Sequence, residues 1–187
     1  GPYAPRAGYD AILQAMGGLM SVTGHLDGEP GAGPMKVGPS IVDYMTGMNS
    51  SIGILAALYH RKANGGEGQH VDVCLFDTVI ASLSHYAQIF LVNGQTPPRR
   101  GTWGNGGMPA GVFRCTDGEL MLVVGNDGQF ARTCAVLGQP ALATDPRFVK
   151  NNDRVVHGKE IMAIFAGLFL KKPVAAWLEE LEKAGVP

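Results

Sequence analysis

The sequence predicts a mixed α/β chain in two parts, a helix-rich part around one strand over residues 1–100 and a smaller α+β part over residues 101–187. Three patterns indicate this class. Apolar residues recur at helical spacing through residues 43–62, and apolar and polar residues alternate through residues 69–75. Two further apolar runs flank the turn Asp117-Gly118, as in a β-hairpin. A strand between helices, followed by a hairpin and more helices, is typical of α/β and α+β domains.

The first part is expected to be mostly helical, with one strand and one long loop. Gly17-Gly18 ends a short helix, and Asn64-Gly65-Gly66 ends a long one. The expected elements are a helix over 8–17, a glycine- and proline-rich loop over 24–39, a helix from Asp43 to Lys62, a strand from Gln69 to Leu75 and a helix from Asp77 to about Val92.

The long helix from Asp43 to Lys62 has one apolar face and two internal glycines. The apolar face comprises Met45, Met48, Ile52, Leu55 and Tyr59. Gly47 and Gly53 each cost about 1 kcal/mol of helix propensity relative to Ala. Two such residues in an otherwise favourable helix suggest that another backbone packs close to it.

The second part begins with an irregular stretch, residues 94–111, which holds the expected boundary between the two parts. A hairpin is expected to follow, with residues 112–114 paired to residues 120–124. Asn126 or Asp127 is expected to cap a helix that runs to Leu137. Two more helices are expected over residues 153–170 and 173–184.

Composition and charge exclude several classes of function. Of the 187 residues, 45% are hydrophobic and 17% are charged, which suits a folded domain and not a disordered chain. The formal net charge of −1 gives no electrostatic support for a nucleic-acid partner. No apolar run is long enough to span a bilayer, so we expect no membrane partner.

The cysteines and histidines give no sign of a metal site or a disulfide framework. Cys74, Cys115 and Cys134 are far apart and form no CxxC pair, which is typical of buried thiols in a reducing compartment. The 5 histidines include no pair with ligand spacing, so no metal is expected. With no signal or transit peptide visible, the expected location is the cytoplasm, or the mitochondrion for a eukaryotic protein.

Asp43 is the first candidate for chemistry. It lies where the long helix is expected to begin, and the helix dipole and free N–H groups there stabilise the carboxylate anion. One interpretation is a simple N-cap. The other is a nucleophilic carboxylate, kept away from water by the neighbouring Ile41, Val42 and Tyr44.

Two other groups of residues have both a functional and a structural interpretation. Tyr9 and Asp10 could line the mouth of an active site, or could be a half-buried side chain and a helix cap. The run Gly104, Asn105, Gly106 and Gly107 would let backbone approach a ligand closely, or could be a flexible connection. It is not a dinucleotide fingerprint, since no strand and helix flank it in the required order.

Several segments together resemble class III CoA-transferases of the CaiB/BaiF type, in particular the branch that acts on formyl-, succinyl- and glutaryl-type acids. The resemblance covers nearly the whole chain. It rests on Arg6-Ala7-Gly8-Tyr9-Asp10, Gly17-Gly18-Leu19-Met20, Val42-Asp43, Ile52-Gly53-Ile54-Leu55, Gly68-Gln69-His70-Val71-Asp72-Val73 and Val124-Gly125-Asn126-Asp127-Gly128.

The resemblance implies a fold, a reaction and partners. Residues 1–100 would be part of a Rossmann-like large domain. Residues 101–187 would form the small α+β domain together with the family's glycine loop, which would correspond to Gly104 to Gly107. Asp43 matches the nucleophilic aspartate, which forms an anhydride and then a thioester with CoA. Tyr9, Asp10 and the glycine loop would contact the substrate. The substrates would be an acyl-CoA and a small carboxylic acid, with no permanently bound cofactor and with an interlocked homodimer as the assembly.

Two alternatives stay open on the sequence. Related acyl-CoA racemases carry His where this chain has Tyr9, and a phenol with an ordinary pKa near 10 is a poor base for a substrate α-proton. The chain has no initiator Met and ends directly after a helical pattern, so a fragment without activity of its own is the other alternative.

Overall fold

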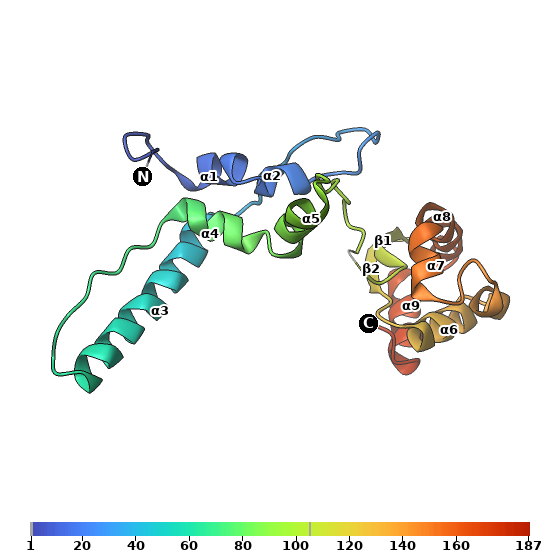
Figure 1. Ribbon diagram of the computed structural model, residues 1–187. Coiled ribbons are helices and arrows are strands. Elements are labelled where there is room, and N and C mark those ends of the chain that lie inside the picture. The colour runs from blue at the N-terminus through green and yellow to red at the C-terminus, as the bar shows by residue number, and fades with distance from the viewer. Residues whose placement is uncertain (1, 105) are drawn as a thin grey trace. The chain divides into compact units, whose positions relative to one another are not determined.

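The computed structural model describes residues 2–104 and 106–187, which contain helices and one two-stranded sheet and form two compact units (Figure 1). The first unit is Gly1–Gly101 and the second is Thr102–Pro187. Each unit has its own hydrophobic cluster, and each is described by itself below.

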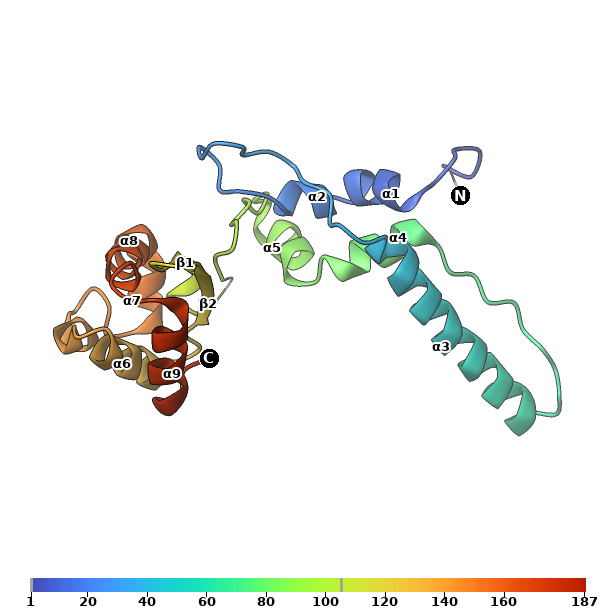
Figure 2. The same ribbon diagram turned by 180° about the vertical axis from the view of Figure 1, so that it is seen from behind.

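The first unit is helical throughout its described secondary structure. Its longest helix, α3, is followed by an extended segment that leads back to α4 (Figures 1 and 2). A Cβ atom built on Gly53 would lie 2.9 Å from Cγ1 of Val71, so this glycine makes room for the returning segment. The helices are α1 (Asp10–Met16), α2 (Leu19–Val22), α3 (Ile41–Ala63), α4 (Leu75–Ser82) and α5 (His85–Asn93).

The predicted strand from Gln69 to Leu75 is wrong for this structure. Residues 69–74 are extended but unpaired, and Leu75 already begins α4. The alternation that predicted the strand is real, but a strand also needs a neighbour with which to exchange backbone hydrogen bonds. Within the described residues, the one two-stranded sheet lies in the second unit.

The predicted single helix from Asp77 to Val92 is also wrong, because the chain bends between α4 and α5. The axes of the two helices differ by 80°. Ser84 lies at the bend with a φ of 51°, the one positive φ of a non-glycine residue in the described chain. The apolar pattern continues across the bend, so periodicity alone could not reveal it.

Two buried polar side chains join α1 to the start of α3. Asp10 is 5% exposed, and its Oδ1 accepts the backbone N–H groups of Val42 at 2.8 Å and Asp43 at 3.4 Å. Its Oδ2 accepts a hydrogen bond from Nε2 of Gln14 at 2.7 Å. Gln14 is fully buried, and its Oε1 accepts the N–H of Val37 at 2.9 Å. This network satisfies N–H groups of the first turn of α3, which have no partner within the helix.

The second unit contains the sheet and the remaining helices, in keeping with the predicted hairpin. β1 (Ala110–Arg114) pairs with β2 (Glu119–Val123) antiparallel, with Val112 opposite Met121. The predicted helix over residues 153–170 is two helices, α7 (Asn151–Val156) and α8 (Gly158–Phe169), which meet at His157. The other elements are α6 (Asp127–Val136), the 3-10 helix η1 (Pro140–Thr144) and α9 (Val174–Lys183).

Two caps show how the second unit fixes its helix starts. Asn126 caps α6, because its Oδ1 accepts the N–H of Gln129 at 2.9 Å while Oε1 of Gln129 accepts the N–H of Gly125 at 2.7 Å. The pair resembles a capping box, except that Gln129 accepts from Gly125, the residue before the N-cap, and not from Asn126 itself. The cap of α9 comes from the hairpin turn, where Oδ1 of Asp117 accepts the N–H of Val174 at 2.8 Å.

The core of the second unit is rich in aromatic side chains. Phe165 is fully buried, and its ring lies parallel to that of Phe130 at 6.1 Å. The rings of Phe113 and Phe169 are 4.9 Å apart, and Nε1 of Trp177 donates to the carbonyl of Phe169 at 2.8 Å. Side chains from the strands and the helices therefore pack together in one hydrophobic core.

The first unit buries far fewer hydrophobic side chains than the second. Its cluster contains three buried hydrophobic residues, Leu13, Val42 and Val79. The predicted apolar face of α3 lies open, with Met48, Ile52, Leu55 and Tyr59 all more than half exposed.

Among the described residues, no single helix has both the length and the apolar character needed to cross a bilayer. Two bent pairs, α4 with α5 and α8 with α9, reach that threshold when their lengths and compositions are combined.

Truncation of the central aromatic ring should destabilise the second unit. In the full-length protein, Phe165→Ala should lower the free energy of unfolding by about 3–5 kcal/mol, because it removes a fully buried ring and leaves a cavity. Lys159→Ala, on the exposed face of the same helix, should change it by less than about 0.5 kcal/mol. Chemical denaturation would measure both, and equal effects would contradict this account of the core.

Removal of the Asp10 carboxylate should loosen the start of α3. Asp10→Ala should lower the free energy of unfolding by about 1–3 kcal/mol, because backbone N–H groups and the Gln14 amide lose a buried acceptor. Hydrogen exchange followed by mass spectrometry should show faster exchange in peptides covering residues 40–45. Asp10→Asn keeps one acceptor oxygen and should lose less. Unchanged exchange in the Ala variant would refute the cap.

Candidate functional site

Asp43 is the third residue of α3, and its carboxylate is exposed. The helix begins at Ile41 with Ser40 as its N-cap residue, so the interpretation of Asp43 as the cap is wrong. The capping carboxylate comes instead from Asp10, which also binds the backbone of Asp43. Within the described chain the Asp43 carboxylate has no hydrogen-bond partner, which leaves it free to react.

The residues next to Asp43 do not shield it from water within this chain. Val42 is fully buried in the core of the first unit, and Ile41 is half-buried against it. Tyr44 is 70% exposed. Exclusion of water from Asp43 by these three side chains in the full-length protein stays a prediction.

Tyr9 and Asp10 have different surroundings although they are neighbours. Tyr9 is the N-cap residue of α1, and its side chain is 76% exposed and makes no capping bond. Asp10 is buried, and its described partners are the backbone of α3 and the side chain of Gln14. The structure thus brings Asp10 and Asp43 together, with Tyr9 at the adjoining surface. Contact of Tyr9 or Asp10 with a substrate stays a prediction.

The glycine loop of the second unit is held closely at two of its glycines and is open at a third. A Cβ atom on Gly107 would lie 2.4 Å from the carbonyl oxygen of Val124, and one on Gly104 would lie 2.8 Å from Cβ of Ala110. One on Gly106 would meet nothing within 4 Å. None of these three has a positive φ, so close packing and not unusual backbone geometry explains Gly104 and Gly107. Asn105 lies outside the described residues.

Sequence reasoning missed three polar residues that bond near the start of α3 or near the glycine loop. Gln14 follows Asp10 by four positions, a spacing that places both on one helix face, so the signal was available. Asn151 begins α7, and its Nδ2 donates to the carbonyl of Gly106 at 2.7 Å. Nε of Arg154, on the same helix, donates to the carbonyl of Met108, just after the glycine loop, at 2.6 Å. These two partners are 45 and 46 residues away in the chain, so no local pattern indicated the bonds.

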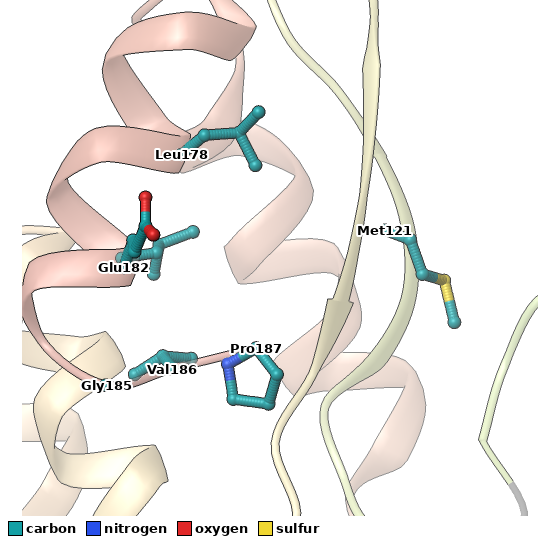
Figure 3. Close-up of a pocket in the computed structure, with 7 residues that line it drawn as sticks. Met121, Leu178, Glu182, Gly185, Val186 and Pro187 are labelled. Atoms are coloured by element: carbon teal, nitrogen blue, oxygen red, sulfur yellow. The ribbon is translucent and has the colours of Figure 1, made fainter.

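Two hollows lie apart from these residues. One, of about 530 Å³, is lined by α9, the segment that follows it and Met121 of β2 (Figure 3). The other, of about 230 Å³, is lined by parts of α3, α4 and the segment before α4, including Asp72 and Asp77. Asp43, Tyr9, Gly104, Gly106 and Gly107 line neither hollow. Among residues 2–104 and 106–187, no three potential metal ligands gather in one place.

The buried thiols of the second unit are poor nucleophiles at neutral pH. Burial raises the pKa of Cys134 to about 12. Burial, and next the charge of Asp117, raise the pKa of Cys115 above its ordinary value. Because the thiolate is the reactive form, neither residue competes with a carboxylate for covalent chemistry.

Curated relatives match the chain along its whole length. It is 42% identical over 187 residues to a succinate–glutarate CoA-transferase of Agrobacterium fabrum, of which it covers 46%. It is 40% identical to an acetyl-CoA:oxalate CoA-transferase of Acetobacter aceti, of which it covers 47%. A human succinyl-CoA:glutarate CoA-transferase is 34% identical, with 42% of its length covered. The chain thus spans less than half the length of these relatives.

Solved structures and a family model point to the same family as these relatives. A CAIB/BAIF family protein from Brucella suis is 38% identical with a TM-score of 0.81, and the match covers 100% of this chain and 48% of that one. Rv3272 of Mycobacterium tuberculosis, at 23% identity and a TM-score of 0.82, shares the fold. Residues 1–187 match the family described as CoA-transferase family III. The chain therefore belongs to CoA-transferase family III.

Proposed function

We propose that the full-length protein is a CoA-transferase that moves CoA between an acyl-CoA and a small carboxylic acid, with Asp43 as the nucleophile. The observation that carries the proposal is the free, exposed carboxylate of Asp43 on the first turn of α3. The three relatives described above are all named as CoA-transferases, which supports CoA transfer as the class of reaction.

The reaction proceeds through two kinds of covalent intermediate on Asp43. The carboxylate attacks the thioester carbonyl of the donor acyl-CoA, which gives a mixed anhydride and releases CoA thiolate. The thiolate then attacks the carbonyl carbon of Asp43, which gives an aspartyl-CoA thioester and releases the donor acid. The acceptor carboxylate attacks the carbonyl carbon of this thioester, which forms a second anhydride and releases CoA thiolate again. CoA thiolate attacks the acceptor carbonyl of that anhydride, which yields the new acyl-CoA and restores Asp43.

The start of α3 suits this chemistry. Asp43 lies on the first turn of α3, at the positive end of the helix dipole, where negative charge returns when Asp43 leaves as a carboxylate. Asp10 fixes the backbone of Asp43, so the nucleophile sits on a rigid turn and not on a loop. The anhydride and thioester also need protection from water, and in our proposal the glycine loop supplies it in the full-length protein.

The environment of Tyr9 favours transfer over racemisation. Racemisation at the α-carbon needs an acid and a base on either side of the substrate. Tyr9 is largely exposed and is not the histidine that related racemases carry at this place. A carboxylate nucleophile alone is enough for CoA transfer.

The exposed apolar surface of the first unit supports a larger assembly. We propose that residues 1–100 belong to a Rossmann-like large domain and that residues 101–187 form the small α+β domain. The open face of α3 and the unpaired residues 69–74 would then be covered by the rest of the protein and by a second copy in an interlocked homodimer.

Replacement of Asp43 should abolish transfer and leave the fold intact. In the full-length enzyme, Asp43→Asn should reduce kcat by at least about 10³-fold, because a neutral amide cannot form the anhydride. Hydroxylamine added during turnover should leave a hydroxamate on Asp43, which mass spectrometry of the digested wild-type protein would locate.

A matched control comes from Asp153, which is likewise the third residue of its helix, α7. Asp153→Asn should keep transfer within about threefold of the wild type, since that position has no place in the proposed reaction. Near-normal transfer by Asp43→Asn, or a hydroxamate on another residue, would show that Asp43 is not the nucleophile.

A further inference from the structure

Gln14, on the second turn of α1, is a polar side chain that is fully buried. Burial of an amide costs free energy unless its nitrogen and oxygen are hydrogen-bonded. Here Nε2 donates to Oδ2 of Asp10 at 2.7 Å, and Oε1 accepts the backbone N–H of Val37 at 2.9 Å. Nε2 also lies 3.5 Å from the carbonyl oxygen of Pro39. One amide thus joins α1 to the loop that leads into α3.

The partners of this amide determine which way it faces. Its nitrogen lies against two acceptors, a carboxylate oxygen of Asp10 and the carbonyl of Pro39, while its oxygen lies against a backbone N–H. The reversed amide would place an oxygen against oxygens and N–H groups against an N–H. This position therefore needs a side chain with a donor on one side and an acceptor on the other. Neither a carboxylate nor a thioether offers both.

The hydrogen bond from Gln14 fixes the rotation of the Asp10 carboxyl. It occupies Oδ2, which leaves Oδ1 directed at the backbone N–H groups of Val42 at 2.8 Å and Asp43 at 3.4 Å. Without the amide, Oδ2 would be a buried acceptor with no partner among the described residues. The carboxyl could then gain by turning toward other donors or water, and its hold on the first turn of α3 would weaken.

The loop just before α3 is held at several backbone groups. Nζ of Lys36 donates to the carbonyls of Val37 at 2.7 Å and Gly38 at 2.6 Å, and the N–H of Ile41 donates to the carbonyl of Pro39 at 2.8 Å. The amide of α1 adds the bond to the N–H of Val37. Because the same amide also holds the carboxylate that caps α3, the loop and the first turn of the helix share one support.

We propose that Gln14 is a positioning residue for the nucleophile, because it keeps Asp10 in the orientation that holds the backbone of Asp43. The inference rests on the proposed function. Asp43 attacks, and later leaves as a carboxylate, in each turnover, so its placement affects the rate of each covalent step. Gln14 is buried and makes no contact with substrate in this proposal. Its loss should therefore lower kcat and leave KM for both substrates nearly unchanged.

Two variants of the full-length enzyme remove the amide donor in different ways. Gln14→Met keeps the length of the side chain and loses both hydrogen bonds, whereas Gln14→Glu keeps an acceptor for Val37 and sets a second carboxylate against Asp10. We expect each to lower kcat by about ten- to a hundredfold, with both KM values within about threefold of the wild type. If one variant does not fold, the other carries the test. Hydrogen exchange in peptides covering residues 36–45 should quicken in both.

An exchange of the two functional groups tests the hydrogen bond itself. In the double variant Asp10→Asn/Gln14→Glu, the amide at position 10 donates to the carboxylate at position 14, so the direction of the bond is reversed. The amide oxygen at position 10 still accepts the backbone N–H groups of α3. The double variant should have a kcat at least about fivefold above that of Gln14→Glu alone, although it carries one more substitution. Absence of this recovery would contradict the bond as the cause of the loss.

Gln88 provides the matched control, because it is an exposed glutamine of α5 whose side chain makes no hydrogen bond within the described chain. Gln88→Met and Gln88→Glu should leave kcat, KM and the exchange of residues 36–45 unchanged. Wild-type kcat in the Gln14 variants, or a loss that appears only in KM, would overturn the inference.

Hydroxylamine trapping distinguishes failure of this inference from failure of the proposed function. If wild-type Asp43 carries the hydroxamate and the Gln14 variants turn over as the wild type does, the nucleophile stands and the positioning role falls. If wild-type Asp43 carries no hydroxamate, the proposed function fails and the inference fails with it.

Discussion

The carboxylate of Asp10 lies between α1 and the first turn of α3, where it accepts backbone N–H groups of Val42 and Asp43. The start of α3 depends on this bond, since the N-cap residue Ser40 offers no side-chain cap of its own. Gln14 extends the same network to the loop before the helix. A buried carboxylate keeps its place only while such donors remain, so α1, the loop and α3 are fixed together.

In the second unit, too, polar side chains bond to backbone groups that are distant in the sequence. These bonds fix helix starts and a loop. Asp117 in the hairpin turn caps α9, and Asn151 with Arg154 holds the glycine loop. These bonds surround an aromatic core that supplies most of the apolar burial. Hydrophobic packing stabilises this unit, and the polar contacts decide which backbone segments are rigid enough to serve a site.

The two segments proposed to act in catalysis are held in different ways. Asp43 sits on a regular helix whose first turn is capped from another element, which gives the nucleophile a fixed backbone and a free side chain. The described residues of the glycine loop lie in no helix or strand, and Asn151 bonds to the backbone of Gly106 and of Met108 just after the loop. A nucleophile benefits from rigidity, and the capped first turn of α3 supplies it for Asp43.

The sequence by itself determined the long helix, the hairpin around Asp117-Gly118 and Asp43 as the candidate nucleophile, because periodicity, turn residues and family motifs are local signals. It did not determine the unpaired residues 69–74, the bend at Ser84 or the cap that Asp10 provides to α3. Whether an extended segment finds a neighbour, or a carboxylate a distant N–H group, depends on segments brought together only by folding. The tertiary structure therefore decided which polar residues hold the site, although each was visible in the sequence.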